Sequence, residues 1–352
     1  MPRRSICVCS VQAPFIVGGA EILASELAST LKARGFLVDV VNIPFKWYPV
    51  QDIVKQALIW RFVEVTESNG VPIDMVIPTK FPSYLVRHPL KVTWLFHQHR
   101  EVYDLYGTPY CSFTDDPEEQ EIRQTILRMD AKTLRESKRI FTISKNVSER
   151  LSRFNGIASE TLYPPPHYAG RYREGEFADY ALYAGRLETL KRCEILVEAF
   201  RYVDPGARLI VAGRGPQLEN LERQAERLGL QDRIRFAGFV PEEELLSLYA
   251  GAFAVLYAPV DEDYGYVTVE AFLSGKPVVT CKDSGGTLEF VEDGVTGFVV
   301  EPEPQALADA VNRLFRDRRL ARDLGAAGRP RVAGIGWDAV IDALTEPLRR
   351  SP

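Results

Sequence analysis

Two glutamates flanking a glycine turn have the residue types needed to hold a ligand that carries both hydroxyls and phosphate. The stretch EDYGYVTVEAFLSGKPVVT runs from Glu262 to Thr280, and seven residues separate Glu262 from Glu270. One carboxylate can accept hydrogen bonds from both hydroxyls of a sugar diol. Gly265 precedes a helical pattern, and the N–H groups at a helix N-terminus bind phosphate. The stretch therefore predicts two polyol-binding carboxylates beside a phosphate site.

A simpler explanation exists for one of these carboxylates. The pattern places Glu270 in the first turn of the helix, where the helix dipole favours an acidic residue regardless of function. The residue types alone leave both interpretations open.

Two basic residues follow a strand-like run near the middle of the chain. The stretch AGRLETLKR covers residues 184–192, so Arg186 and Lys191 are expected just beyond the C-terminal end of that strand. Two fixed cations at this position suit a diphosphate. The alternative is a solvated basic loop.

Glycine-bearing turns precede two further helical patterns. The first is VQAPFIVGGAE, residues 11–21, with Gly18 and Gly19, and the second is VAGRGPQLENL, residues 211–221, with Gly213. Glycine lets the backbone approach a ligand closely, and a helix N-terminus offers N–H groups to an anion. A tight turn or a plain helix start accounts for each stretch equally well. The first is not the G-x-G-x-x-G dinucleotide pattern.

The elements that must position these residues alternate between strand-like and helix-like patterns. The segment 161–180 breaks the alternation with three consecutive prolines, which neither continue a helix nor sit in a central strand, and it is interpreted as a linker. Strands separated by helices on both sides of a linker predict an α/β protein with two doubly wound parallel sheets, in residues 1–165 and 166–335. Ligands of such sheets bind beyond the C-terminal ends of the strands, here in the cleft between the domains. Strands are expected at 6–11, 37–41, 75–77, 92–96, 139–142, 180–184, 208–211, 234–236, 254–257, 277–280 and 297–300, and long helices at 20–34 and 117–137.

Composition excludes several classes of function. The 352 residues carry a formal net charge of −5, so no global basic field points to nucleic acid. The five cysteines are scattered and odd in number, which favours a reducing cytoplasm over a disulfide framework, and no ligands at metal spacing accompany them. The N-terminal apolar run ends too early, at Gln12 and Pro14, for a signal peptide. No apolar stretch is long enough to span a membrane.

Together these motifs resemble the retaining glycosyltransferases of family 4, the group 1 glycosyltransferases of the GT-B superfamily. The stretch 262–280 is similar to that family's two-glutamate signature, GRLETLK to its phosphate clamp and GGAE to its N-terminal glycine loop. SGGTLEFVEDGVTGFVV, residues 284–300, matches a further glycine-rich stretch of the family, and GWDAVIDAL, residues 336–344, resembles its closing helix. The resemblance covers nearly the whole chain and is strongest in the C-terminal half.

The resemblance implies two Rossmann-like domains facing each other across a cleft. The N-terminal domain, residues 1–165, would bind the acceptor, and residues 336–352 would pack back on it. The domain at 166–335 would bind a nucleotide-sugar donor, with a UDP-, GDP-, ADP- or dTDP-sugar as candidates. The acceptor would be a glycan, a lipid-linked carbohydrate or a small molecule. No cofactor and no metal are implied, because the cations and the helix N-terminus supply the positive charge.

Residue by residue, the resemblance assigns roles to matching positions. Arg186 and Lys191 would neutralise the departing diphosphate, Glu262 would meet the transferred sugar and Glu270 would accept from the ribose hydroxyls. The turn that meets the donor phosphates and sugar would comprise Gly265, Tyr266 and Val267, and Gly18, Gly19 and Gly213 would also contact the donor. Many family members have Pro-Phe-Gly after the first glutamate, where this chain has Asp-Tyr-Gly at 263–265.

Two histidines follow the strand expected at 92–96. The family places a histidine at this strand end, facing the sugar, which His97 matches, and His99 is the alternative, on the acceptor side. A structural role in packing is the simpler interpretation of either residue alone.

Two rival classes of function stay open beside the transferase. A nucleotide-sugar epimerase or phosphorylase can share the double fold, although a phosphorylase needs a lysine for pyridoxal phosphate and neither Lys276 nor Lys282 lies in a recognisable site. A subunit that binds nucleotide-sugars without turnover is the other. Peripheral membrane contact is a further alternative for the aromatic and basic segment 45–63, whose apolar positions 50, 53, 54, 57 and 58 favour packing of one helix face in the core.

Overall fold

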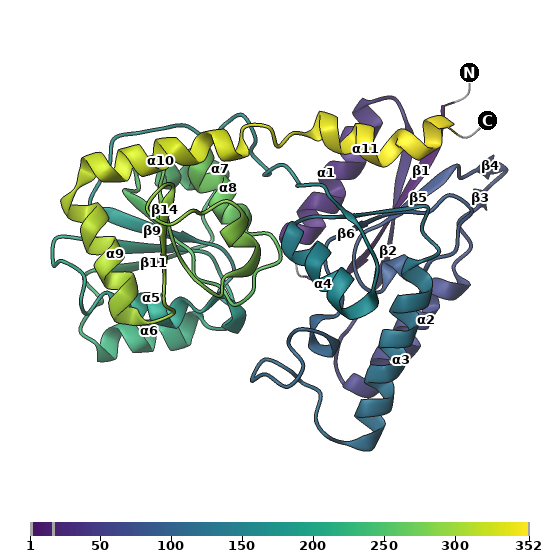
Figure 1. Cartoon of the computed structure of the whole chain (residues 1–352), viewed down its shortest axis with the longest axis horizontal. Helices are drawn as coiled ribbons and strands as arrows, with labels where there is room; N and C mark the ends of the chain where they lie inside the picture. Colours follow the sequence, from purple (N-terminus) through teal and green to yellow (C-terminus); the bar gives the residue numbers. More distant parts are fainter. Residues whose placement is uncertain (1–2, 16–17, 351–352) are drawn as a thin grey trace. The chain divides into compact units, whose positions relative to one another are not determined.

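The structure is a computed structural model that describes residues 3–15 and 18–350. It divides into two compact units, one formed by residues 3–15, 18–167 and 336–350 and the other by Tyr168–Ile335. The first change of unit thus falls two residues beyond the predicted boundary, and the second falls where it was predicted. Each unit has a parallel β-sheet with helices packed on it (Figure 1). The expected class, an α/β protein with two doubly wound parallel sheets, is confirmed.

The first unit has two three-stranded parallel sheets joined by isolated bridges. The orders are β2-β1-β5 and β6-β7-β8, and the bridges pair Val76 with Lys91 and Lys80 with His97. The strands are β1 (Ser5–Gln12), β2 (Leu37–Pro44), β5 (Met75–Pro78), β6 (Val92–Leu95), β7 (Arg139–Thr142) and β8 (Glu160–Thr161), with a small hairpin of β3 (Glu67–Ser68) and β4 (Val71–Pro72) outside them. The central strand β1 is buried over seven of its eight residues, as expected of a parallel strand covered on both faces.

The helices of the first unit begin and end at residues suited to those positions. They are α1 (Gly19–Ala33), α2 (Ile53–Phe62), α3 (Pro117–Leu134), α4 (Lys145–Asn155) and α11 (Trp337–Arg350). The Asp116 side chain caps α3, Pro117 occupies its first turn, and Ser144 caps α4. The ring of Trp337 in α11 packs edge-on against Trp94, with 6.2 Å between the centroids. The last helix is therefore part of the first unit.

The second unit contains one six-stranded parallel sheet in the order β11-β10-β9-β12-β13-β14. Its strands are β9 (Tyr180–Ala184), β10 (Arg208–Ala212), β11 (Ile234–Gly238), β12 (Ala254–Leu256), β13 (Val278–Cys281) and β14 (Gly297–Val300), and its helices are α5 (Cys193–Ala199), α6 (Leu218–Arg227), α7 (Glu242–Gly251), α8 (Tyr266–Leu273), α9 (Pro304–Arg316) and α10 (Arg318–Val332). Helices α5 and α6 cover one face and α7, α8 and α10 the other (Figure 1). Strands β10 and β11 follow β9 in order on one side of the sheet. The chain then returns to place β12 on the other side of β9, and β13 and β14 follow on that side. The sheet therefore has its topological switch point between β9 and β12.

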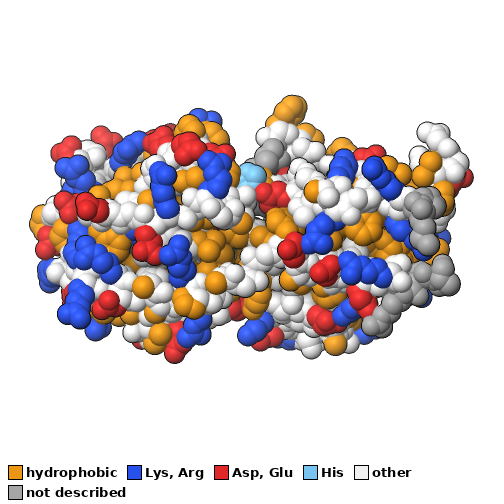
Figure 2. Space-filling model, turned by 90° about the horizontal axis from the view of Figure 1, so that it is seen from above, with side chains coloured by type: hydrophobic (Ala, Val, Ile, Leu, Met, Phe, Trp, Pro, Cys, Tyr) orange, Lys and Arg blue, Asp and Glu red, His pale blue; other side chains and the backbone are white. Residues whose placement is uncertain are grey.

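Charged side chains of both signs are interspersed over the face drawn in Figure 2, as expected of a chain whose net charge is small. Among the described residues, no helix combines the length and the apolar character needed to cross a membrane.

Candidate functional site

The loops that leave β9 and β12 meet at the switch point of the second sheet. The N–H of Val260 donates to the carbonyl oxygen of Leu190 at 2.8 Å. The guanidinium of Arg192 donates to the carbonyl oxygens of Ala258 and Pro259, at 2.9 and 3.0 Å, and pairs with Asp283 at 2.6 Å. Arg192 is 8% exposed, so these bonds form inside the protein and fix the two loops against each other. This is the edge of the sheet at which α/β proteins bind ligands.

Lys191, Tyr257 and Glu262 form a cluster at this point. The hydroxyl of Tyr257 donates to Glu262 Oε2 at 2.7 Å, and the Lys191 ammonium contacts the same hydroxyl at 3.2 Å. Lys191 also forms an ion pair with Glu262. The side chains of Lys191 and Glu262 are 21% and 15% exposed, so both charged groups can still be reached by a ligand. The structure thus brings together a cation and a carboxylate that the sequence placed on separate motifs.

Tyr257 acts as a hydrogen-bond donor in this cluster. Burial raises the pKa of its phenol well above the usual value, and the neighbouring Glu262 carboxylate raises it further. The phenol therefore keeps its proton at neutral pH and holds one oxygen of Glu262 in place.

Helix α8 is preceded by Gly265, which adopts a left-handed conformation with φ of 83°. A Cβ atom at this position would lie 2.9 Å from Thr287 Oγ1, so glycine fits both the backbone angle and the space. No side chain caps the helix, and its first two residues are Tyr266 and Val267. The N-terminus of α8 therefore presents backbone N–H groups as expected of an anion site.

Glu270 does not lie in the first turn of this helix, contrary to the prediction. The left-handed glycine starts the helix at Tyr266, so Glu270 is its fifth residue and the first turn holds no acidic side chain. Interaction with the helix dipole falls off beyond the first turn and does not account for this glutamate. Instead, the buried hydroxyl of Tyr249 in α7 donates to Glu270 Oε2 at 2.6 Å. The carboxylate is thus held in one orientation by a second helix.

Arg186 and Gly213 have local partners in the structure. The Arg186 guanidinium pairs with Glu188 at 2.6 Å, and its side chain is 45% exposed, so it does not share the partners of Lys191. A Cβ atom on Gly213 would lie 1.8 Å from the carbonyl oxygen of Gly185. Close packing of the two loops alone therefore requires glycine at position 213.

His97 and His99 belong to the first unit and have different surroundings. Strand β6 ends at Leu95, and His97 Nδ1 lies 3.0 Å from the carbonyl oxygen of Gln98. The ring of His99 stacks on Phe81, with 5.5 Å between the centroids, and its Nε2 is shielded from solvent. Burial lowers the pKa of His99 to about 4, with a smaller contribution from His97, so the ring is neutral at physiological pH. Aromatic packing accounts for His99.

The predicted glycine loop of the first unit leads into α1. Gly18 is the residue before the helix, and its N–H donates to Glu21 Oε2 at 2.9 Å, while Gly19 is the first helical residue. Glu21 in turn pairs with Lys80. Residues 16 and 17 of this loop lie outside the described residues.

Three residues that stabilise the site had no signal in the sequence. The sequence pattern placed Tyr257 at the end of a predicted strand, Tyr249 within a predicted helix and Arg192 at the end of a basic loop. Their partners lie 66, 21 and 91 residues away along the chain, in Lys191, Glu270 and Asp283. Only the fold brings these pairs together.

Across residues 3–15 and 18–350, no three His, Cys, Asp or Glu side chains are grouped to hold a metal ion.

Comparison with known proteins places a family match in the second unit. Residues 171–331 match the family described as Glycosyl transferases group 1. D-inositol 3-phosphate glycosyltransferase from Frankia alni is 33% identical over 211 residues, which cover 56% of this chain and 52% of that protein. A GDP-mannose-dependent alpha-(1-6)-phosphatidylinositol monomannoside mannosyltransferase from Mycobacterium tuberculosis is 36% identical over 211 residues, covering 55% and 54%. The chain thus spans about half the length of these curated relatives.

The fold of the whole chain has solved counterparts. Sucrose-phosphate synthase from Thermosynechococcus elongatus superposes with a TM-score of 0.81 at 22% identity and covers 99% of both chains. The two parallel-sheet units therefore form the GT-B fold.

Proposed function

We propose that this chain is a retaining group 1 glycosyltransferase of family 4, which moves a sugar from a nucleotide-sugar to a glycan, lipid-linked or small-molecule acceptor. The observation that carries the proposal is the cluster of Lys191, Tyr257 and Glu262 at the switch point of the second sheet, beside a helix that starts at a left-handed glycine. The cluster lies within the residues that match the glycosyltransferase family. The names of the curated relatives, both transferases, support the same class.

The reaction places new negative charge on the diphosphate. The bond between the anomeric carbon and the diphosphate oxygen breaks, and its electron pair leaves with the diphosphate. The acceptor hydroxyl forms the new bond on the same face of the sugar and passes its proton to the departing phosphate oxygen. Lys191 and the N–H groups of Tyr266 and Val267 stabilise the departing charge, which is electrostatic preorganisation. Arg186 assists from the adjoining loop once it exchanges Glu188 for the phosphate.

The two glutamates hold different parts of the donor in this proposal. Glu262, fixed by Tyr257, accepts from hydroxyls of the transferred sugar. Glu270, fixed by Tyr249, accepts from the ribose hydroxyls. In this proposal the first unit holds the acceptor, and His97, Gly18 and Gly19 are its candidate substrate-binding residues.

A donor screen tests the proposal. UDP-, GDP-, ADP- and dTDP-sugars are each added to the purified chain, and the melting temperature is measured, because a ligand that binds the native state raises it. We expect a rise with the sugars of one base, and release of the nucleoside diphosphate when an acceptor is added. If none of the four classes raises the melting temperature and none is consumed, the proposal is wrong.

The proposed reaction needs no divalent metal, since Lys191 and the α8 N-terminus supply the positive charge. Turnover in excess EDTA should therefore equal turnover without it. Activity that is lost with EDTA and returns with Mg²⁺ or Mn²⁺ would contradict this and would make Asp261 and Asp263, which flank Glu262, candidate ligands.

We also propose that the protein acts in the cytoplasm, at the membrane surface. All five cysteines are free, in agreement with a reducing compartment. On α2, Leu58, Ile59 and Phe62 are 38%, 45% and 85% exposed, and the exposed Lys55 lies on the same helix. Trp60, in contrast, is fully buried in the core. An apolar surface beside a lysine suits an anionic lipid interface.

Vesicle co-sedimentation tests the membrane contact. Anionic vesicles should retain the wild-type chain at low salt and retain Phe62→Ser less. Tyr202→Ser, which removes an aromatic side chain that is 43% exposed on the second unit, serves as the control. Equal retention of the two variants, or none for the wild type, would remove this part of the proposal.

A further inference from the structure

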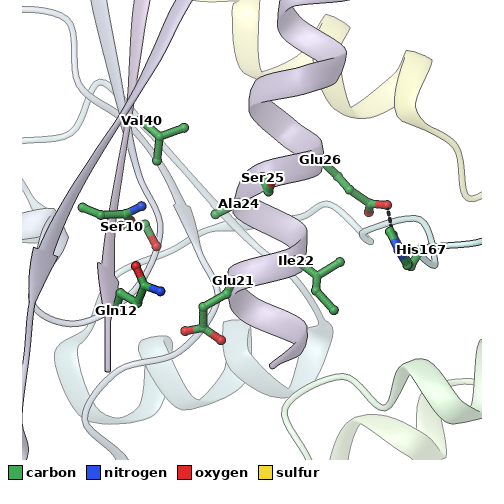
Figure 3. A pocket seen from close by; sticks show the side chains of 10 residues that line it. Ser10, Gln12, Glu21, Ile22, Ala24, Ser25, Glu26, Val40 and His167 are labelled. Atoms are coloured by element: carbon green, nitrogen blue, oxygen red, sulfur yellow. Dashed lines mark hydrogen bonds and ion pairs between the residues drawn. The ribbon is translucent and has the colours of Figure 1, made fainter. Parts of the chain in front are cut away.

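A pocket of about 390 Å³ opens in the first unit between helix α1 and strands β1 and β2 (Figure 3). Its volume lies in the range of small-molecule sites, about 300–1,000 Å³. None of the residues proposed to bind the donor is among those that line this pocket.

The strands present neutral polar side chains to this pocket. Ser10 and Asn42 are paired in the register of β1 and β2, and Gln12 follows two residues after Ser10, so all three lie on one face of the sheet. Ser25 of α1 completes the set from the helix side. Hydroxyls and amides both donate and accept hydrogen bonds, which matches the hydroxyls of a polyol.

These four side chains form no hydrogen bonds with the part of the protein that the structure describes. Asn42 and Ser25 are exposed, but Ser10 is only 2% exposed. The Ser10 residue is otherwise enclosed by the protein, but its hydroxyl lines the pocket. A ligand that enters the pocket can therefore form a hydrogen bond with it.

The remaining lining residues favour an uncharged ligand. Ile22, Ala24 and Val40 supply an aliphatic surface for the C–H face of a ring. Glu26 and His167 are paired with each other, as the dashed line in Figure 3 shows, and Glu21 is paired with Lys80. No lysine or arginine is among the described lining residues, so a phosphate would find two carboxylates and no free cation.

We propose that this pocket binds an uncharged polyol ring, a monosaccharide or a cyclitol, and that this ring is part of the acceptor. The binding stands on the pocket itself, whereas the acceptor role rests on the proposed function.

Binding of small probes to the full chain tests the site. Methyl α-glucoside and myo-inositol represent the two sources of polyol, and glucose 6-phosphate represents an anionic sugar, each titrated by saturation-transfer difference NMR. We expect one of the uncharged probes to bind and glucose 6-phosphate to bind at least tenfold more weakly. Which uncharged probe binds more tightly distinguishes a carbohydrate from a cyclitol. Tighter binding of the phosphorylated sugar, or no binding of either uncharged probe, overturns the proposal.

Matched variants on one helix locate the binding. Ser25→Ala and Asn42→Ala should each weaken binding of the uncharged probe about three- to tenfold, the range of one neutral hydrogen bond. Ser29→Ala removes the same hydroxyl one turn further along α1, at an exposed position outside the pocket, and should bind as the wild type does. Equal losses in Ser25→Ala and Ser29→Ala overturn the assignment to this pocket.

The donor screen separates this inference from the proposed function. All three variants should keep the rise in melting temperature given by the nucleotide-sugar, because none of them alters a residue that is proposed to bind the donor. If a polyol binds but no nucleotide-sugar raises the melting temperature, the acceptor role and the transferase proposal are both wrong. The assignment of polyol binding to the pocket is unaffected by that result.

Discussion

The orientation of Glu270 by Tyr249 leads to a prediction about donor affinity. If Glu270 accepts hydrogen bonds from the ribose, far from the bond that breaks, its contact is similar in the ground state and the transition state. Glu270→Ala should then raise the donor KM with little change in kcat. A hydrogen bond to a charged group contributes about 1.5–3 kcal/mol, so the expected rise is roughly ten- to a hundredfold. Glu270→Gln should be milder, since the amide keeps one acceptor.

Tyr249→Phe extends the test to the residue that positions the carboxylate. The phenol is fully buried and donates at 2.6 Å, and phenylalanine keeps the ring and its edge-on contact with Tyr172. We expect a KM rise of about three- to tenfold, smaller than for Glu270→Ala because the carboxylate is still present but free to turn. Tyr180→Phe is the matched control, because its hydroxyl donates to the carbonyl oxygen of Leu248 at 2.9 Å and not to Glu270.

Steady-state kinetics with varied donor, at saturating acceptor, measures all four variants. Circular dichroism melting shows whether each variant is folded. The reasoning is refuted if Glu270→Ala keeps the wild-type KM, or if Tyr249→Phe and Tyr180→Phe change it equally. In either case Glu270 and Tyr249 form a structural bond between two helices and nothing more.

Three further predictions concern charge. Lys191→Ala should lower kcat/KM at least a hundredfold when the donor concentration is varied. Arg186→Ala should lower kcat/KM less, because the Arg186 side chain is 45% exposed and solvent screens its charge. Equal losses in the two variants would argue against the cluster as the phosphate site. His97→Ala should lower kcat. His99→Ala should lower the melting temperature through loss of aromatic packing, and it should leave the pH–rate profile between pH 5 and 8 unchanged, because the pKa of His99 is about 4. A pH–rate profile that is shifted in His99→Ala would contradict this. Burial raises the pKa of Asp130 to about 7, although hydrogen bonds from Tyr84 and Tyr103 oppose the shift. The stabilisation that the protonated Asp130 side chain contributes is thus fully present below about pH 4 and is lost as the pH rises to about 7. Urea unfolding should show the wild-type midpoint falling over this range more steeply than that of Asp130→Asn, and equal slopes would refute the assignment.

The sequence was sufficient to predict most of the secondary structure because the strands are buried and apolar and their turns carry glycine. The strand predicted at 180–184 has the observed bounds of β9, and helix α1 begins and ends within a residue of its prediction. Helix α3 ends three residues early, at Leu134. The error at Glu270 has a defined cause. One residue in the left-handed conformation started α8 at Tyr266, and sequence periodicity alone does not locate a helix start to that accuracy.

The site was predictable only in part, because its motifs are local and its contacts are not. The two-glutamate motif predicted Glu262 and Glu270 as site residues, and the clamp motif predicted Lys191; these remain predictions. The pairing of Lys191 with Glu262 and the roles of Tyr257 and Tyr249 depend on which strands lie side by side. At Gly213 the sequence suggested contact with a ligand, but the structure gives a different reason for glycine. A side chain at this position would collide with the carbonyl oxygen of Gly185.

Isothermal titration with nucleoside diphosphates tests the central claim, that the switch point of the second sheet binds the donor diphosphate. UDP, GDP, ADP and dTDP are titrated into the wild-type chain and into Lys191→Met, which keeps the length of the side chain and removes its charge. The account predicts saturable binding of at least one diphosphate, with the affinity in Lys191→Met reduced tenfold or more, since each lost charge-assisted hydrogen bond weakens binding by about that factor. Binding of none of the four, or equal affinity in both proteins, would contradict it.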